Sequence, residues 1–202
     1  MIKLYTAGTP NGRKVSIALE ELELPYEVHA VDLASSEQLQ PEFLALNPNN
    51  KIPVIDDDGL VIWESGAILL HLAEKTGQLL PADPAGRMAA IQYAFFQTGG
   101  IGPNLGRLGA QLRRPEEERN EEMVKIFGDE IERLMGVLDR ILEDGRDYLV
   151  GEYSIADIMQ FPWLDIPLKM KMDLVTSRPR LVAWLERIGA RPAVQRGMQV
   201  PS

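Results

Sequence analysis

Cysteine is absent from the 202 residues of this chain. The absence excludes a disulfide framework, a zinc site with cysteine ligands and a cysteine nucleophile. Histidine occurs only twice, as His29 and His71, and these residues are too far apart in the sequence to give a spacing typical of a metal site. Because the polypeptide has no thiol, sulfur chemistry at this protein must use sulfur that a ligand supplies.

Long apolar runs and an excess of basic residues are missing as well. No apolar segment approaches the ~18 residues that a membrane span needs, and the first five residues lack the features of a secretory signal. Acidic residues number 30 and Lys plus Arg 21, which gives a formal net charge of −9. Nucleic acids and anionic membranes bind basic surfaces, so we expect neither as a partner and expect a cytoplasmic protein.

The first 80 residues predict an α/β domain. Alternating residues or short apolar runs predict strands over 2–6, 26–32, 52–55 and 60–63. Apolar residues at helical spacing predict helices over 12–23, within 34–47 and from Ser65, as its cap, to about Gly77. The strand–helix–strand start implies a right-handed parallel crossover, and the hairpin adds antiparallel strands. We therefore expect one mixed four-stranded sheet with helices on it.

A Pro-rich segment over 81–86 predicts a linker, after which no strand pattern appears. Helices are predicted over 87–109, with an interruption at Gly99-Gly100 and Gly102-Pro103, and over 115–143, 155–172 and around 181–188. Pro115 and the acidic residues after it suit a helix start, and Ser154 with Asp157 predicts a capping box. We therefore expect an all-helical domain over 87–202.

The first feature that could carry chemistry is Thr9 and Asn11, at a strand-to-helix junction. A helix N-terminus presents free backbone N–H groups and partial positive charge, which stabilise an anion such as a thiolate. The Thr9 hydroxyl and the Asn11 amide can each donate a hydrogen bond to that anion. The alternative is that one of them only caps the helix.

The second feature is Pro53, which stands at the start of a short strand after Ile52. The low base rate of cis X–Pro bonds favours a trans bond and an edge strand. A cis bond would turn the backbone N–H and C=O of Ile52 outward, where a peptide-like ligand could pair with them.

The third feature is the pair Glu64 and Ser65, at the entry to a helix. Ser65 and the N–H groups after it suit a carboxylate, and Glu64 suits an amine, so together they could hold the α-amino-acid end of a ligand. The alternative is a plain helix cap with an acidic neighbour.

In this order and on this domain pattern, the chain resembles the glutathione S-transferases over nearly its whole length. The motifs that carry the resemblance are Thr-Pro-Asn-Gly at 9–12, Asn-Pro-Asn-Asn-Lys-Ile-Pro at 47–53, Glu-Ser-Gly-Ala-Ile-Leu at 64–69, Gly-Gly-Ile-Gly-Pro at 99–103 and Tyr-Ser-Ile-Ala-Asp at 153–157. They are similar to the Nu class, a bacterial group related to the yeast prion protein of nitrogen regulation. The resemblance implies a thioredoxin-like, glutathione-binding domain over 1–80 and an all-α domain over 87–202 on the side of the second substrate.

The resemblance also implies roles for individual residues towards glutathione, the co-substrate. Pro53 would follow a cis bond, against the base-rate expectation, and the Ile52 backbone would pair with the cysteinyl unit. Glu64 and Ser65 would hold the γ-glutamyl amine and carboxylate. The remaining implied contacts are Lys51 and Gln38 to the glycyl carboxylate, and Thr9 and Asn11 to the sulfur.

By the same resemblance, the protein is expected to be a metal-independent homodimeric enzyme that reduces disulfide bonds with a bound glutathione thiolate. A basic residue of the partner subunit, Lys125 or Arg133, would also reach the ligand. Since the protein has no cysteine, both the attacking and the resolving thiol must be glutathione, so we expect room for two glutathiones or one glutathione disulfide. The alternatives are conjugation of small electrophiles and a non-catalytic, glutathione-binding regulator.

Overall fold

The computed structural model describes residues 1–201, and the chain forms two compact units. The first unit comprises Met1–Ala82 together with the C-terminal segment from Ile188, and the second comprises Asp83–Arg187. The sequence analysis expected the C-terminal segment in the helical domain, so the two divisions differ after residue 187.

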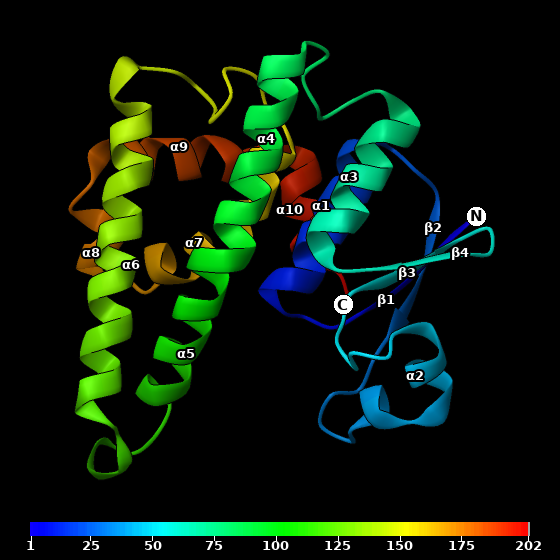
Figure 1. The fold of residues 1–202 in the computed structure, drawn as a ribbon, viewed down its shortest axis with the longest axis horizontal. Coiled ribbons are helices and arrows are strands. Elements are labelled where there is room, and N and C mark those ends of the chain that lie inside the picture. Colours follow the sequence, from blue (N-terminus) through cyan, green and yellow to red (C-terminus); the bar gives the residue numbers. More distant parts are fainter. Residues whose placement is uncertain (202) are drawn as a thin grey trace. The chain divides into compact units, whose positions relative to one another are not determined.

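The first unit is built on one four-stranded sheet in the order β2-β1-β3-β4 (Figure 1). The strands are β1 (Ile2–Thr6), β2 (Tyr26–Ala30), β3 (Val54–Asp57) and β4 (Leu60–Trp63). β1 pairs with β2 in parallel, whereas the β1–β3 and β3–β4 pairs are antiparallel. The expected mixed sheet is confirmed. β3 begins two residues later than expected, because Pro53 has no N–H to donate to a ladder.

Helices cover both faces of this sheet. They are α1 (Pro10–Glu21), α2 (Pro41–Leu46), α3 (Ser65–Thr76) and α10 (Pro192–Gly197). α1 packs against α3 and α10. α2 contributes Phe43 to a separate apolar cluster with Val31 and Val54, against which Tyr5 packs. The starts of α1, α3 and β3, where the candidate site residues lie, are therefore held by a sheet that has helices on both faces.

α10 joins the first unit because it lies directly on α1. The Ser16 hydroxyl donates a hydrogen bond to the Gly197 carbonyl over 2.7 Å, and Arg191 pairs with Glu21 at 2.7 Å. A Cβ on Gly197 would lie only 2.5 Å from the Cα of Ile17. The absence of a side chain at 197 is what allows the two helices to approach so closely.

Gly197→Ala is therefore expected to destabilise the protein by about 1–3 kcal/mol, the usual cost of forcing extra atoms into a packed contact. Urea unfolding would measure the loss. Gly128→Ala is a matched control, because no atom lies within 4 Å of the Cβ it would add inside a helix, and it should stabilise by about 0.5–1 kcal/mol. Equal effects of the two variants would contradict the close α1–α10 contact.

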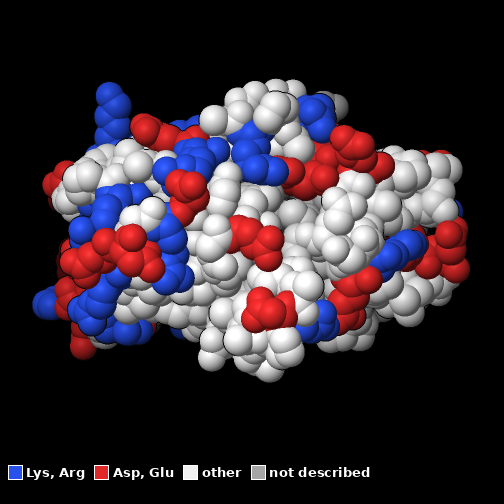
Figure 2. Space-filling model, turned by 90° about the horizontal axis from the view of Figure 1, so that it is seen from above, with Lys and Arg blue, Asp and Glu red and all other residues white. Residues whose placement is uncertain are grey.

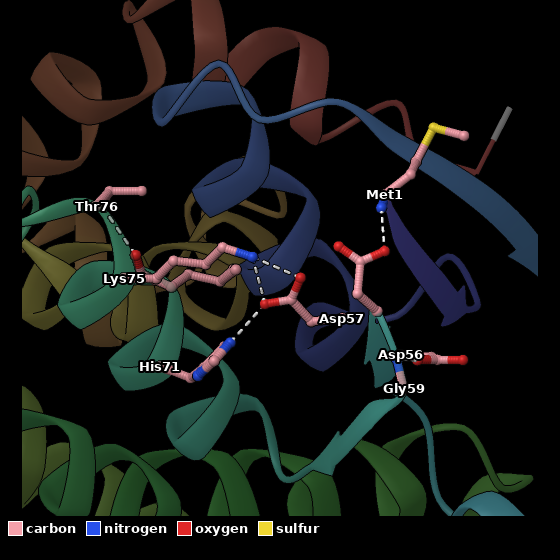
Figure 3. A network of polar contacts seen from close by, with 9 residues as sticks. Met1, Asp56, Asp57, Gly59, His71, Lys75 and Thr76 are labelled. Atoms are coloured by element: carbon pink, nitrogen blue, oxygen red, sulfur yellow. Dashed lines mark hydrogen bonds and ion pairs between the residues drawn. The ribbon is translucent and has the colours of Figure 1, made fainter.

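A buried carboxylate ties α3 to the sheet (Figure 3). Lys75 Nζ donates to both oxygens of Asp57 at 2.6 Å, and the His71 ring lies 2.8 Å from Asp57 Oδ2. Burial opposes ionisation of Asp57, but these hydrogen bonds outweigh it and hold the pKa of the carboxyl below its ordinary value. His71 thus has a structural partner at the end of β3.

The second unit is helical, and its described residues contain no strand. Its helices are α4 (Pro84–Phe96), α5 (Gly102–Leu112), α6 (Glu121–Ile141), α7 (Ile155–Lys169), α8 (Asp173–Thr176) and α9 (Pro179–Gly189). A π-helical turn over Gln97–Ile101 joins α4 to α5 and contains Gly99 and Gly100, where the sequence predicts an interruption of the helix. α5 packs on α6 and α4 on α7, around a buried core that includes Leu134, Phe161 and Trp184.

The start of α6 differs from the expected one. The sequence analysis placed it at Pro115, but residues Glu116–Glu118 form a short 3-10 turn instead. Asn120 caps α6, since its side-chain oxygen accepts a hydrogen bond from the Met123 N–H at 3.0 Å. The capping box of Ser154 and Asp157 at the start of α7 is confirmed.

Charged side chains are mixed on the surface that Figure 2 shows, where Lys and Arg lie beside Asp and Glu rather than in a separate patch. Exposed pairs of this kind contribute little stability individually. Among the described helices, none is both long enough and apolar enough to cross a bilayer.

Candidate functional site

A pocket of about 130 Å³ in the first unit brings together most of the residues that the sequence analysis selected. It is lined by Asn11, Asn47, Lys51, Ile52, Pro53, Glu64 and Ser65. Six of the eight predicted site residues are in this set, and Thr9 and Gln38 are not. The residues come from the start of α1, the loop before β3 and the start of α3, so three separate segments form one wall.

Thr9 is the N-cap of α1. Its hydroxyl oxygen accepts a hydrogen bond from the Gly12 N–H at 3.2 Å, and Pro10 occupies the first helical position. The capping interpretation is therefore correct for Thr9. It does not exclude a second role, because a hydroxyl that accepts one hydrogen bond still has a proton to donate.

Asn11 is held by a residue that the sequence analysis missed. Lys14, one turn further along α1, is 1% exposed, and its Nζ donates to Asn11 Oδ1 at 2.9 Å and to Ser65 Oγ at 3.5 Å. Burial lowers the pKa of Lys14 to about 7, although the nearby charge of Glu64 acts in the opposite direction. The only sequence signal was its spacing of three residues from Asn11.

The bond between Ile52 and Pro53 is cis. The base-rate expectation was wrong here, and the one implied by the resemblance is confirmed. Ile52 lies outside the β1–β3 ladder, which ends at the pair of Tyr5 and Val54. The loop before it is held by buried Asn47, whose amide donates to the Lys51 carbonyl at 2.7 Å. Asn47 was not selected from the sequence.

Glu64 has an unusual backbone, with φ 71° and ψ 115°. A side chain other than glycine in such a region costs on the order of 1–3 kcal/mol and is typical of functional sites. Glu64 is the N-cap residue of α3 but makes no side-chain cap, and Ser65 is the first helical residue. The expectation that Ser65 caps the helix is therefore wrong, because its hydroxyl accepts from Lys14 instead.

The described residues include no group of three or more His, Asp or Glu side chains arranged to hold a metal ion. The polar groups of the pocket suit an organic ligand instead. They offer a carboxylate, an amide, an ammonium and hydroxyl groups, together with the N-terminus of α3.

Comparison with known proteins agrees with this picture. The model of the glutathione S-transferase N-terminal domain matches residues 1–74, and that of the C-terminal domain matches residues 102–192. The chain belongs to the glutathione S-transferase family. The disulfide-bond oxidoreductase YfcG of Escherichia coli is 44% identical over 201 residues, which cover 96% of this chain and 92% of that protein.

Two solved structures of the family are also close. One is a glutathione transferase from Burkholderia graminis, with two glutathione molecules bound per subunit. Its TM-score is 0.93 and its sequence identity 47%, and the match covers 100% of this chain and 88% of that protein. The other is from Pseudomonas putida, with one glutathione disulfide bound per subunit. Its TM-score is 0.92 and its sequence identity 44%, and the match covers 100% of this chain and 92% of that protein.

The remaining residues selected from the sequence lie elsewhere in this transferase. Gln38 is in a 3-10 turn over Glu37–Leu39, and its neighbours Glu37 and Gln40 line a different, more open hollow of about 430 Å³. Lys125 and Arg133 are exposed on α6, where they pair with acidic residues of the same helix. The small pocket does not include any of these three residues.

Proposed function

We propose that this transferase is a glutathione-dependent disulfide-bond reductase of the Nu class. The observation that carries the proposal is the pocket itself, which combines Asn11 at a helix start, the cis Ile52–Pro53 bond and the Glu64–Ser65 pair in a protein without cysteine. Such a protein needs a ligand that supplies the thiol, and glutathione is that ligand.

The pocket suits the γ-glutamyl end of the tripeptide. Glu64 offers a carboxylate to the ligand's amine, and Ser65 offers a hydroxyl and the α3 N-terminus to the ligand's carboxylate. At about 130 Å³ the pocket is smaller than the few hundred Å³ typical of whole-ligand sites, so only one end of the tripeptide would be enclosed. The Ile52 backbone would pair with the cysteinyl unit, and Lys51 and Gln38 would reach the glycyl carboxylate.

Thr9 and Asn11 would stabilise the thiolate. A cysteine thiol has a pKa of about 8.5, and two or three donors at a helix start suffice to lower it by roughly one to two units. The thiolate attacks one disulfide sulfur, the S–S bond breaks, and the departing thiolate takes up a proton. A second glutathione thiolate then attacks the mixed disulfide, which releases the second thiol and leaves glutathione disulfide.

This sequence of steps needs space for two glutathiones or one glutathione disulfide beside the first unit. The relatives from Burkholderia graminis and Pseudomonas putida hold these ligands, and their similarity to this chain supports the same stoichiometry here. In this proposal, residues 1–80 bind glutathione and the helices of Asp83–Arg187 face the second substrate. The cytoplasm, where the glutathione pool is reducing, is the compartment that suits the reaction.

The proposal includes a homodimer, in which Lys125 or Arg133 of one subunit reaches the ligand of the other. Both side chains are exposed on α6 in the chain described. Light scattering should then give a mass of about twice 22.6 kDa. A mass near 22.6 kDa at micromolar concentration would contradict the dimer.

One set of assays tests the proposed function. Reduction of hydroxyethyl disulfide with glutathione should be fast, conjugation of glutathione to a dinitrophenyl electrophile should be slow, and calorimetry should detect binding of both reduced and oxidised glutathione. Faster conjugation than reduction would favour the electrophile-conjugating alternative. Tight binding without either activity would favour a regulator, and the absence of binding at millimolar concentration would refute the proposal.

Glu64 gives a prediction in which stability and binding change independently. Both Glu64→Ala and Glu64→Gly should weaken glutathione binding by roughly 10- to 100-fold, the usual effect of removing a charged hydrogen-bond partner. Glycine adopts φ 71° without strain, so Glu64→Gly should be more stable than Glu64→Ala by about 1 kcal/mol. Calorimetry and urea unfolding would measure the two effects, and equal stability of the variants would exclude a strained backbone at this position.

A further inference from the structure

Lys14 lies behind the wall of the glutathione pocket rather than in it. It is not among the lining residues, and its side chain is one of the largest that are fully buried. Yet its ammonium contacts two side chains that do line the pocket, Asn11 from α1 and Ser65 from α3. A buried lysine is rare unless it is paired, so its position beside the site calls for a physical reason.

The chemistry of an ammonium group restricts how its two neighbours can point. An ammonium donates hydrogen bonds and accepts none, so Asn11 must present its carbonyl oxygen to Lys14, at 2.9 Å. The amide NH₂ of Asn11 is then on the opposite side of that side chain. Ser65 likewise uses an oxygen lone pair towards Lys14, which leaves its hydroxyl proton for another acceptor.

We propose that Lys14 is a positioning residue, which orients Asn11 and Ser65 as hydrogen-bond donors towards bound glutathione. The inference rests on the proposed function, since it assigns the two donors to the sulfur and to the γ-glutamyl carboxylate. Without Lys14, the Asn11 amide could rotate by 180° and turn its oxygen lone pairs towards the thiolate, which would repel it. The buried ammonium of Lys14 thus connects a side chain at the start of α1 with one at the start of α3.

The position of Lys14 also fits a ligand that carries negative charge. The charge of Glu64 acts on Lys14, and the ligand's amine would engage that carboxylate. Because burial lowers the pKa of Lys14 to about 7, a bound thiolate and carboxylate would favour its charged form. The hydrogen bonds of Lys14 fix the orientation of Asn11 and Ser65, and this electrostatic effect acts in the same direction.

The test measures the pKa of the thiol of bound glutathione from its thiolate absorbance, which needs no turnover. Lys14→Met keeps the length of the side chain but has no donor, and it should raise that pKa by about one unit, a tenfold change in the ionisation equilibrium. In the Asn11→Ala background, Lys14→Met should raise the thiol pKa by clearly less than it does in the wild-type background, since most of its effect acts through Asn11 and only the direct effect of its charge remains. Lys14→Leu, which also has no donor, serves in the same comparisons if Lys14→Met does not fold.

Lys75→Met is the matched control. Lys75 also bonds to a side chain of its unit, the buried Asp57, but neither residue lines the pocket, so this variant should lose stability without moving the thiol pKa. An unchanged thiol pKa in Lys14→Met, or additive effects with Asn11→Ala, would overturn the positioning role. If the wild-type protein binds no glutathione, the proposed function fails instead, and the two failures are distinguished.

Discussion

Asn11→Ala should lower kcat/KM for disulfide reduction by roughly 30- to 100-fold at pH 7. If the pKa of the bound thiol rises from about 7 to about 8.5, the thiolate fraction falls about 15-fold. The more basic thiolate is also about fivefold more nucleophilic, so ionisation alone explains only about a threefold loss. The larger part, about tenfold or more, is expected from lost orientation of the sulfur, which the proposal assigns to Asn11 in the pocket wall.

The pH dependence separates these two contributions. At pH 9 the thiol is ionised in both proteins, so the defect of Asn11→Ala should be about tenfold smaller than at pH 7. Asn120→Ala is a matched control, because Asn120 also lies at a helix start but caps α6 in the second unit. It should cost about 1 kcal/mol of stability and leave the pH profile unchanged. Equal rates for wild type and Asn11→Ala would remove Asn11 from the mechanism.

Sequence pattern predicted the first unit well because its signals are local. Alternation marks β1, and the apolar runs beside the turn at Asp58 and Gly59 mark the hairpin of β3 and β4. The start of α6 was missed because two local signals competed. Pro115 with three glutamates resembles a helix start, but the asparagine cap five residues later is the one that pairs with a backbone N–H.

The features that sequence reasoning missed depend on distant contacts. The hydrogen bond from Ser16 to Gly197 joins residues 181 positions apart, and no local pattern predicts that α10 returns to α1. Lys14 was missed for the same reason. In the sequence it resembles an ordinary polar residue of an amphipathic helix, and only the fold places Ser65, 51 positions away, beside it. The cis bond before Pro53 contradicts the base rate and was expected only through family resemblance.

The candidate site was more predictable than its supporting residues. Asn11, Glu64 and Ser65 were selected because each combines a suitable functional group with a helix start, whereas Ile52 was selected through family resemblance, and all four line one pocket. The residues that hold them, such as Asn47 and Lys14, bind through side chains whose partners depend on the fold. A single sequence therefore predicts the residues that line this pocket better than the residues that hold them in place.

Asp157→Ala should destabilise the protein by about 3–5 kcal/mol at pH 7, a large part of the usual total of about 5–15 kcal/mol. Asp157 Oδ1 accepts from the Leu149 N–H at 3.1 Å and from the Trp184 indole N–H at 2.9 Å, and Oδ2 accepts from the Ser154 N–H at 3.0 Å. Alanine would leave these three buried donors without an acceptor, at about 1–3 kcal/mol each before relaxation.

The pH dependence of the stability loss and a comparison with Ser154→Ala make the prediction for Asp157 specific. Burial raises the pKa of Asp157 to about 6, although the hydrogen bonds oppose the rise. A carboxyl whose pKa is raised on folding stabilises the protein most below its ordinary value of 3.8, and this contribution is lost as the pH rises to about 6. The loss in Asp157→Ala should therefore be larger at pH 4 than at pH 7. Ser154→Ala removes the cap to the Ala156 N–H and one long hydrogen bond of 3.4 Å to Asp157 Oδ2, and it should cost about 1 kcal/mol. A similar cost for both variants in urea unfolding would mean that the donors around Asp157 find other acceptors.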